Sequence, residues 1–157
     1  MPIIEDATSL PAYLSAGQRL LGLDLGTKTI GLAVADTYHQ IATPFDTIRR
    51  TKFGADAAQL EAVIDAGNIG GLVLGLPLNM DGSAGPRVQA THAFVRNLAA
   101  RDSFPDLPVL MWDERLSTAA VERTLIDADT SRAKRSAVID KMAAAFILQG
   151  VLDRLNG

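Results

Sequence analysis

The sequence contains no cysteine, so neither a disulfide framework nor a thiolate metal site can form. No apolar run reaches the roughly 18 residues that a membrane-spanning helix needs. The N-terminal segment, residues 1–18, also contains no Lys, no Arg and no long apolar stretch, which argues against a secretory signal. These absences predict a cytoplasmic location and no membrane partner.

Positive charge is scarce as well, since 15 Lys and Arg residues face 18 Asp and Glu residues and the net charge is −3. A protein that coats nucleic acid through a general positive field is therefore not expected. Two short basic clusters remain, namely Arg49, Arg50 and Lys52, and Arg132, Lys134 and Arg135. On charge alone these are solvent-facing loop residues, although a local basic groove stays open as an alternative.

The length of 157 residues suits one domain that can bury a substantial core. Residues 1–18 show little periodicity and predict an irregular N-terminal leader, followed by a single domain over residues 19–157. Strands are expected over residues 19–25, 29–35, 41–49, 71–76 and 109–112, and helices over residues 55–66, 86–100, about 118–126 and 136–155.

The first three strands follow one another through short connections, which predicts an antiparallel meander. Pro44 in the third strand indicates an edge position or an irregularity. Helices and strands then alternate in the order α-β-α-β-α, with an extra helix near the end. The predicted fold class is α/β, with a five-stranded mixed sheet and helices on both faces.

The strand over residues 19–25, RLLGLDL, holds Asp24 within an apolar segment. Side chains alternate along a strand, so Leu20, Gly22 and Asp24 share one face. An ionised carboxylate in such a setting is costly unless another group pairs with it. The sequence therefore raises the question of what compensates the burial of Asp24.

A second acid, Asp140, lies near the start of the last expected helix. At 100° per residue it falls on an apolar face with Ala143, Ala144 and Ile147, so it should point toward the sheet. The two alanines would allow helix and sheet to approach closely. The alternative is that Asp140 only interacts with the positive end of the helix dipole.

A third acidic site, WDERLST, ends the fifth expected strand. Asp113 and Glu114 point to opposite faces, so only one of them can aim at Asp24. The alternative is a pair that caps the next helix, with Arg115 as its salt-bridge partner.

Three carboxylates that converge without a basic partner would repel one another and raise one another's pKa values. A divalent cation removes that cost, and oxygen-only ligands favour Mg²⁺ or Mn²⁺ over Zn²⁺. Such a site is typical of phosphoryl transfer by a two-metal mechanism. The sequence thus predicts that metal ions compensate the burial of Asp24.

Four ordered motifs carry a resemblance to a known family: GLDLGTKTIGLAVAD, LVLGLPLNMDGSAGPR, DERLST and the helix that begins VIDKMAAAFIL. Together they resemble the YqgF/RuvX family, whose members are described as pre-16S rRNA nucleases and as Holliday-junction resolvases. The resemblance covers about residues 19–155 and leaves the leader out. It implies an RNase H-like fold and a hydrolase that cleaves phosphodiester bonds during ribosome biogenesis.

The resemblance implies that Asp24, the acid of the DER motif and Asp140 are the catalytic metal ligands. Relatives with a RuvC-type site place a glutamate on the fourth strand, which reads LVLGLP here and holds no acid. The DER acid would have to replace it, and both Glu114 and Asp113 are candidates. The two-residue period from Trp112 favours Glu114.

The resemblance also implies a structured nucleic acid as substrate, either pre-rRNA or branched DNA. The loop over residues 77–87 would cover the site, where Asn79 and Arg87 could hold a phosphate or a flipped nucleotide. Lys28 and Arg115 could contact backbone phosphates, which fix position rather than sequence. The alternative for the loop is a glycine-rich connector whose Arg87 forms a surface salt bridge.

Two other functions compete with the nuclease. GLDLGT also resembles the phosphate-binding hairpin of actin-like ATPases, where Thr27 would help to hold nucleotide phosphates. Those proteins pair two such domains around the nucleotide. Nucleotide titration would detect this function. The second rival is a non-enzymatic factor that binds RNA or a transcription complex. Within the nuclease hypothesis, junction resolution requires a homodimer with two sites, whereas RNA end processing can be carried out by a monomer.

Overall fold

The computed structural model describes residues 1–79, 81–116 and 132–157. The elements in chain order are β1 (Ile3–Ile4), η1 (Ala7–Tyr13), β2 (Arg19–Leu25), β3 (Thr29–Ala35), β4 (Ala42–Arg49), α1 (Phe53–Ala66), β5 (Ile69–Leu76), α2 (Pro86–Ala99), β6 (Val109–Asp113), η2 (Glu114–Leu116) and α4 (Arg132–Asn156). The helix expected over about residues 118–126 lies outside the described residues. No helix in the described ranges is long and apolar enough to cross a membrane.

The strands form one mixed sheet in the order β1-β6-β5-β2-β3-β4. β2, β3 and β4 pair antiparallel, which confirms the meander, and β2, β5, β6 and β1 pair parallel. The sheet has six strands rather than the predicted five, because Ile3 and Ile4 pair with Val109 and Leu110 of β6. Two residues are too short a segment to show strand periodicity in the sequence.

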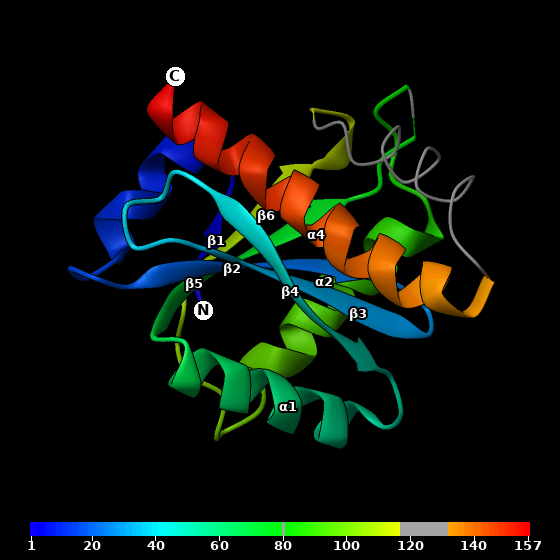
Figure 1. Ribbon diagram of the computed structural model, residues 1–157. Helices are drawn as coiled ribbons and strands as arrows, with labels where there is room; N and C mark the ends of the chain where they lie inside the picture. Colours follow the sequence, from blue (N-terminus) through cyan, green and yellow to red (C-terminus); the bar gives the residue numbers. More distant parts are fainter. Residues whose placement is uncertain (80, 117–131) are drawn as a thin grey trace.

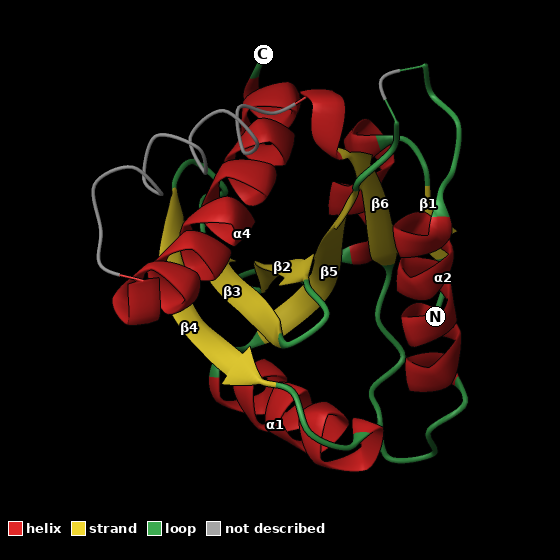
Figure 2. Ribbon diagram, turned by 90° about the vertical axis from the view of Figure 1, so that its right-hand side faces the viewer, coloured by secondary structure: helices red, strands yellow, loops and turns green. Residues whose placement is uncertain are grey.

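Helices cover both faces of the sheet, as predicted (Figures 1 and 2). α4 crosses one face, and α1 and α2 lie on the other. Leu21 and Leu23 belong to the core on the α1 and α2 side, whereas Leu20 belongs to the core beneath α4. The side chains of β2 therefore alternate between the two faces of the sheet, as the sequence predicted.

The leader is more regular than predicted, since it contains both β1 and the 3-10 helix η1. Asp6 caps η1 by accepting a hydrogen bond from the backbone N–H of Thr8 at 3.0 Å. Ile4, Ala7 and Leu10 are buried in the core beneath α4. The division into a leader and a single domain over residues 19–157 stays a prediction.

Within the described residues, the expected element boundaries agree with the observed ones to within two residues, except for the start of α4. α4 begins at Arg132, so the expected start at Ser136 is wrong. Ala133, Lys134 and Arg135 are good helix formers, and the charge of Lys134 and Arg135 does not oppose a helix. β4 is an edge strand, and its register with β3 shifts between Leu32 and Ala33. The edge position and irregularity expected from Pro44 are confirmed.

Candidate active site

The carboxyl end of β2 carries Asp24, whose side chain is only 8% exposed. Because Leu20 contacts the core beneath α4 and side chains alternate along a strand, Asp24 is on the α4 face. This is the face that the sequence assigned to it. Because the Asp24 carboxylate is buried on this face, its surroundings are set by the residues of α4 that pack against the same face.

α4 comes exceptionally close to the sheet beside Asp24. The cross-strand partner of Asp24 is Gly31 of β3. A Cβ atom on Gly31 would overlap the backbone carbonyl oxygen of Asp140, so no side chain fits there. At Gly22 a Cβ atom would lie 2.9 Å from Cβ of Leu148, so α4 fills the space that the sequence left beside Asp24. The glycines let the helix backbone lie against the strands and bring Asp140 to Asp24.

Asp24 and Asp140 line one open pocket of about 380 Å³. The remaining lining residues are Gly26, Thr27, Lys28, Thr29 and Arg87. Lys28 and Arg87 are exposed, and within the part of the chain that the structure describes neither side chain forms an ion pair. The pocket therefore combines less exposed carboxylates with exposed cations, an arrangement that suits a cation and phosphate oxygens together.

Thr29 is a pocket residue that the sequence reasoning missed. Its hydroxyl donates a hydrogen bond to Oδ2 of Asp140. Thr29 and Gly31 are two residues apart on β3 and therefore share the α4 face. The signal was available in the sequence, because both residues follow the turn GTK on the strand that pairs with Asp24.

Glu114 begins η2, directly after β6, and does not line this pocket. Over residues 1–79, 81–116 and 132–157, no three acidic or histidine side chains form a group that could hold a metal ion. Mg²⁺ is nevertheless commonly held by one or two carboxylates together with substrate phosphates. The donors of Asp24 and Asp140 therefore fit a hard divalent cation, and the role of Glu114 stays a prediction.

Asp113, the other acid of the DER motif, is engaged by Arg115. The guanidinium Nε lies 3.0 Å from Oδ1 and Nη2 lies 2.6 Å from Oδ2 of the carboxylate. Hydrogen bonds from the Arg115 side chain hold the pKa of Asp113 below its ordinary value. The contact is the salt-bridge pair that the sequence offered as an alternative, and a catalytic role of Asp113 stays a prediction.

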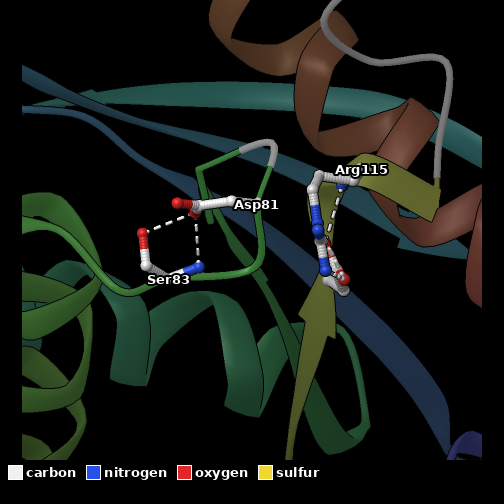
Figure 3. Close-up of polar contacts among 4 residues, drawn as sticks. Asp81, Ser83 and Arg115 are labelled. Atoms are coloured by element: carbon white, nitrogen blue, oxygen red, sulfur yellow. Dashed lines mark hydrogen bonds and ion pairs between the residues drawn. The ribbon is translucent and has the colours of Figure 1, made fainter.

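Neither Asn79 nor Arg115 lines the pocket. Asn79 donates its side-chain amide to Oγ of Ser83 at 3.0 Å, and Asp81 accepts hydrogen bonds from the same serine (Figure 3). Gly82 has φ +86°, and a Cβ atom there would lie 3.6 Å from Nη1 of Arg115. The guanidinium of Arg115 therefore lies beside the loop at Gly82, and contacts of Asn79 and Arg115 with nucleic acid stay predictions.

Arg50 is not the solvated surface charge that its cluster suggested. Its Nη1 donates a hydrogen bond to the carbonyl of Gly26 at 2.6 Å, and its guanidinium lies 5.6 Å from the centre of the Phe94 ring. Its Nε is 3.8 Å from Oδ2 of buried Asp56. Arg49 and Lys52 are exposed, as expected. The second basic cluster belongs to the first turns of α4, rather than to a segment before it.

With this geometry in place, comparison with known proteins identifies the relatives. A sequence profile described as "RuvX: Holliday junction resolvase" matches residues 18–154. The chain belongs to the RuvX family. The resemblance found in the four sequence motifs is confirmed.

Full-length relatives of this RuvX chain are close in sequence. A protein of Paramagnetospirillum magneticum named "Putative pre-16S rRNA nuclease" is 60% identical over 157 residues, which cover 100% of this chain and 99% of that protein. A protein of the same name from Methylocella silvestris is 60% identical over 98% of this chain and 93% of its own length.

Solved structures show the same fold at much lower identity. T. thermophilus RuvC in complex with Holliday junction substrate has a TM-score of 0.56 and 12% identity, over 89% of this chain and 96% of that one. The yeast mitochondrial Holliday junction resolvase has a TM-score of 0.52 and 15% identity, over 94% of this chain and 82% of that one. These likenesses confirm the RNase H-like fold class.

Proposed function

We propose that this chain is a nuclease that processes the 5′ end of pre-16S rRNA during ribosome biogenesis in the cytoplasm. The observation that carries the proposal is the pocket in which Asp24 and Asp140 meet the exposed cations Lys28 and Arg87. Relatives that are 60% identical over nearly the whole chain bear the name of this activity. The reaction is hydrolysis of a phosphodiester bond.

Mg²⁺ or Mn²⁺ is the proposed cofactor, in a two-metal arrangement with Asp24, Asp140 and Glu114 as protein ligands. The oxygen donors of Asp24 and Asp140 fit these ions and would not select Zn²⁺. When bound, the ions would activate water and stabilise the charge on the leaving oxygen. The third ligand is proposed from the sequence motif alone.

The side chains that line the pocket have different proposed roles. Thr29 orients the Asp140 carboxylate through its hydroxyl. Burial of Asp24 beneath α4 restricts the motion of its side chain. Lys28 and Arg87 are proposed to hold the substrate phosphates, because charge-assisted hydrogen bonds to phosphate are stronger than neutral ones.

Holliday-junction resolution is the second candidate function. The description of the family profile and the junction bound by T. thermophilus RuvC favour it. Resolution requires two cuts and hence a homodimer, whereas an RNA end can be processed by a monomer. The two functions therefore predict different oligomeric states as well as different substrates.

The deciding experiment incubates the protein with a pre-16S rRNA fragment and with a four-way DNA junction, in Mn²⁺ or in EDTA. We expect cleavage of the RNA that requires the metal. Replacing even an outer-shell partner of a metal commonly costs about 10–100-fold in activity. Asp24 is proposed as a direct ligand, so Asp24→Asn should reduce cleavage by about a hundredfold or more.

Asp102→Asn is the matched control, because Asp102 is exposed in the loop after α2 and lines no part of the pocket. It should cleave as the unmodified chain does. Full activity of Asp24→Asn, or of the unmodified chain in EDTA, would rule out the metal-dependent mechanism. Cleavage of the junction alone would select the second candidate.

A further inference from the structure

A second, smaller pocket lies on the other side of the turn that follows β2. Its volume is about 50 Å³, and it is lined by Leu25, Gly26, Thr27, Arg50, Arg87, Ala90 and Thr91. Leu25 packs against the core of the α1 and α2 side, and Ala90 and Thr91 belong to α2. Asp24 and Asp140 are on the α4 face. The Gly26–Thr27 turn therefore separates the pocket that holds both carboxylates from a pocket that is lined by two arginines and by no acidic residue that the structure describes.

The walls of the small pocket are suited to an anion. Arg50 is held in place by the carbonyl of Gly26 and the ring of Phe94, so its charge is fixed rather than mobile. Asp56 lies 3.8 Å from Nε of Arg50 and offsets part of that charge, but it does not line the pocket. Arg87 is exposed, and no ion pair of its side chain occurs among the described residues. The pocket thus retains net positive charge.

The size and the donors of the pocket favour phosphate among anions. One water needs about 10–15 Å³ of such volume, so about 50 Å³ holds a group of a few heavy atoms. A guanidinium has five N–H donors in a planar fork that matches phosphate oxygens. Arg50 uses one of them on Gly26, and the exposed Arg87 can approach a phosphate with two.

We propose that this pocket binds a second backbone phosphate of the nucleic acid, one that flanks the scissile phosphate on the same strand. Gly26, Thr27 and Arg87 line both pockets, so a strand that passes over the turn places successive phosphates in the two. The inference rests on the proposed nuclease function, because it takes the scissile phosphate to lie at Asp24 and Asp140. Arg87 then sets the register of the strand, and Arg50 positions both Gly26 and the bound phosphate.

The test measures binding of an RNA that spans the mature 5′ end of 16S rRNA, in EDTA so that no cleavage occurs. One neutral methylphosphonate linkage is moved stepwise along the RNA. A charge-assisted hydrogen bond contributes enough that its loss weakens binding about tenfold. For the unmodified chain we expect a loss of binding at the scissile linkage and, as the sensitive linkage that the second site predicts, at one linkage beside it. Arg87→Ala should bind the unmodified RNA about tenfold more weakly and show no further loss at that linkage.

Arg96→Ala is the matched control, because Arg96 is an exposed arginine in the last turn of the same helix. It should reproduce the scan of the unmodified chain. The log–log salt slope should fall by about 0.7 for Arg87→Ala alone, and circular dichroism checks the fold of both variants. If Arg87→Ala retains the sensitive linkage, or if Arg96→Ala loses it too, the second phosphate site is wrong while the nuclease function stands. If the unmodified chain binds no RNA, the proposed function itself is wrong.

Discussion

Gly31 determines how closely α4 can approach the sheet at the candidate site. It is the cross-strand partner of Asp24, and a Cβ atom on it would meet the carbonyl oxygen, the carbonyl carbon and the next amide nitrogen of the helix backbone at Asp140. Backbone atoms cannot turn away as a side chain can. The position of Asp140 relative to Asp24 therefore depends on a residue that contributes no functional group.

We predict that Gly31→Ala destabilises the protein by about 3 kcal/mol, the upper part of the usual range for overpacking. The added methyl group must displace α4, so cleavage should fall even where the protein remains folded. Urea denaturation measures the first effect and the nuclease assay the second.

Gly54→Ala serves as the control for this substitution. A Cβ atom on Gly54, near the start of α1, would meet only Nη1 of Arg101 at 3.9 Å. The alanine should leave stability unchanged or raise it by less than about 1 kcal/mol, through its better helix propensity. Equal stability of the two variants would show that α4 does not press on Gly31.

At the scale of elements, the connection between β3 and β4 is organised by one carboxylate. Asp36 accepts hydrogen bonds from the backbone N–H groups of Tyr38, Gln40 and Ile41, at 3.2, 2.7 and 2.8 Å. These bonds, led by that of Ile41, lower the pKa of Asp36. The connection also contains His39 at φ 55°, a conformation that the hydrogen bonds help to hold.

Asp36→Ala should lower the melting temperature at neutral pH, and the loss should depend on pH in a defined direction. An unfolded aspartate has a pKa of about 4. Because the folded pKa is lower, the stabilisation is fully present above about pH 4 and is lost as pH falls through the folded pKa. Thermal melts across acid and neutral pH should therefore converge for the variant and the unmodified chain at low pH.

Asp65→Ala is the comparison for this element. Asp65 is exposed near the C-terminal end of α1, where a negative charge opposes the helix dipole. Its removal should leave the melting temperature unchanged or slightly raised at neutral pH. A gap between Asp36→Ala and the unmodified chain that persisted undiminished into strong acid would mean that the carboxylate charge is not the stabilising feature.

At the scale of the whole molecule, residues 1–18 add a strand to the sheet and apolar side chains to the core beneath α4. β1 extends the sheet beyond β6, and Leu10 of η1 is fully buried beneath α4 with Leu110 and Leu148. The leader was expected to be irregular because its two-residue strand and its proline-containing helix carry no periodicity. Its apolar residues nevertheless cover the part of the sheet that would otherwise face water.

Leu10→Ala should cost about 2–5 kcal/mol of unfolding free energy, the range for a buried leucine in a packed core. Tyr13→Ala, at a position of η1 that is 50% exposed, should change it by less than about 0.5 kcal/mol. Denaturant titration of both variants tests the contribution of the leader. Equal and small effects would indicate that the domain is stable without these residues.

The sequence alone determined the features that depend on local periodicity. It placed Asp24 and Leu20 on one face of β2, gave the bounds of β2 and β3, and predicted a close approach between the sheet and an alanine-lined α4. Strand alternation and helical repeat follow from backbone geometry, so they are legible in a short window. The four family motifs could also be recognised in the sequence, because each is a contiguous segment.

Only the tertiary structure decided which distant residues meet. The hydrogen bond from Thr29 to Asp140 and the one from Arg50 to the carbonyl of Gly26 each depend on how elements far apart in the chain pack together. Each polar group had several possible partners of similar chemistry in the sequence. The packing of α4 over Gly31 and of α2 beside the β2 turn selects among them, because close contact at one point leaves each side chain a single position in which its hydrogen bonds are made.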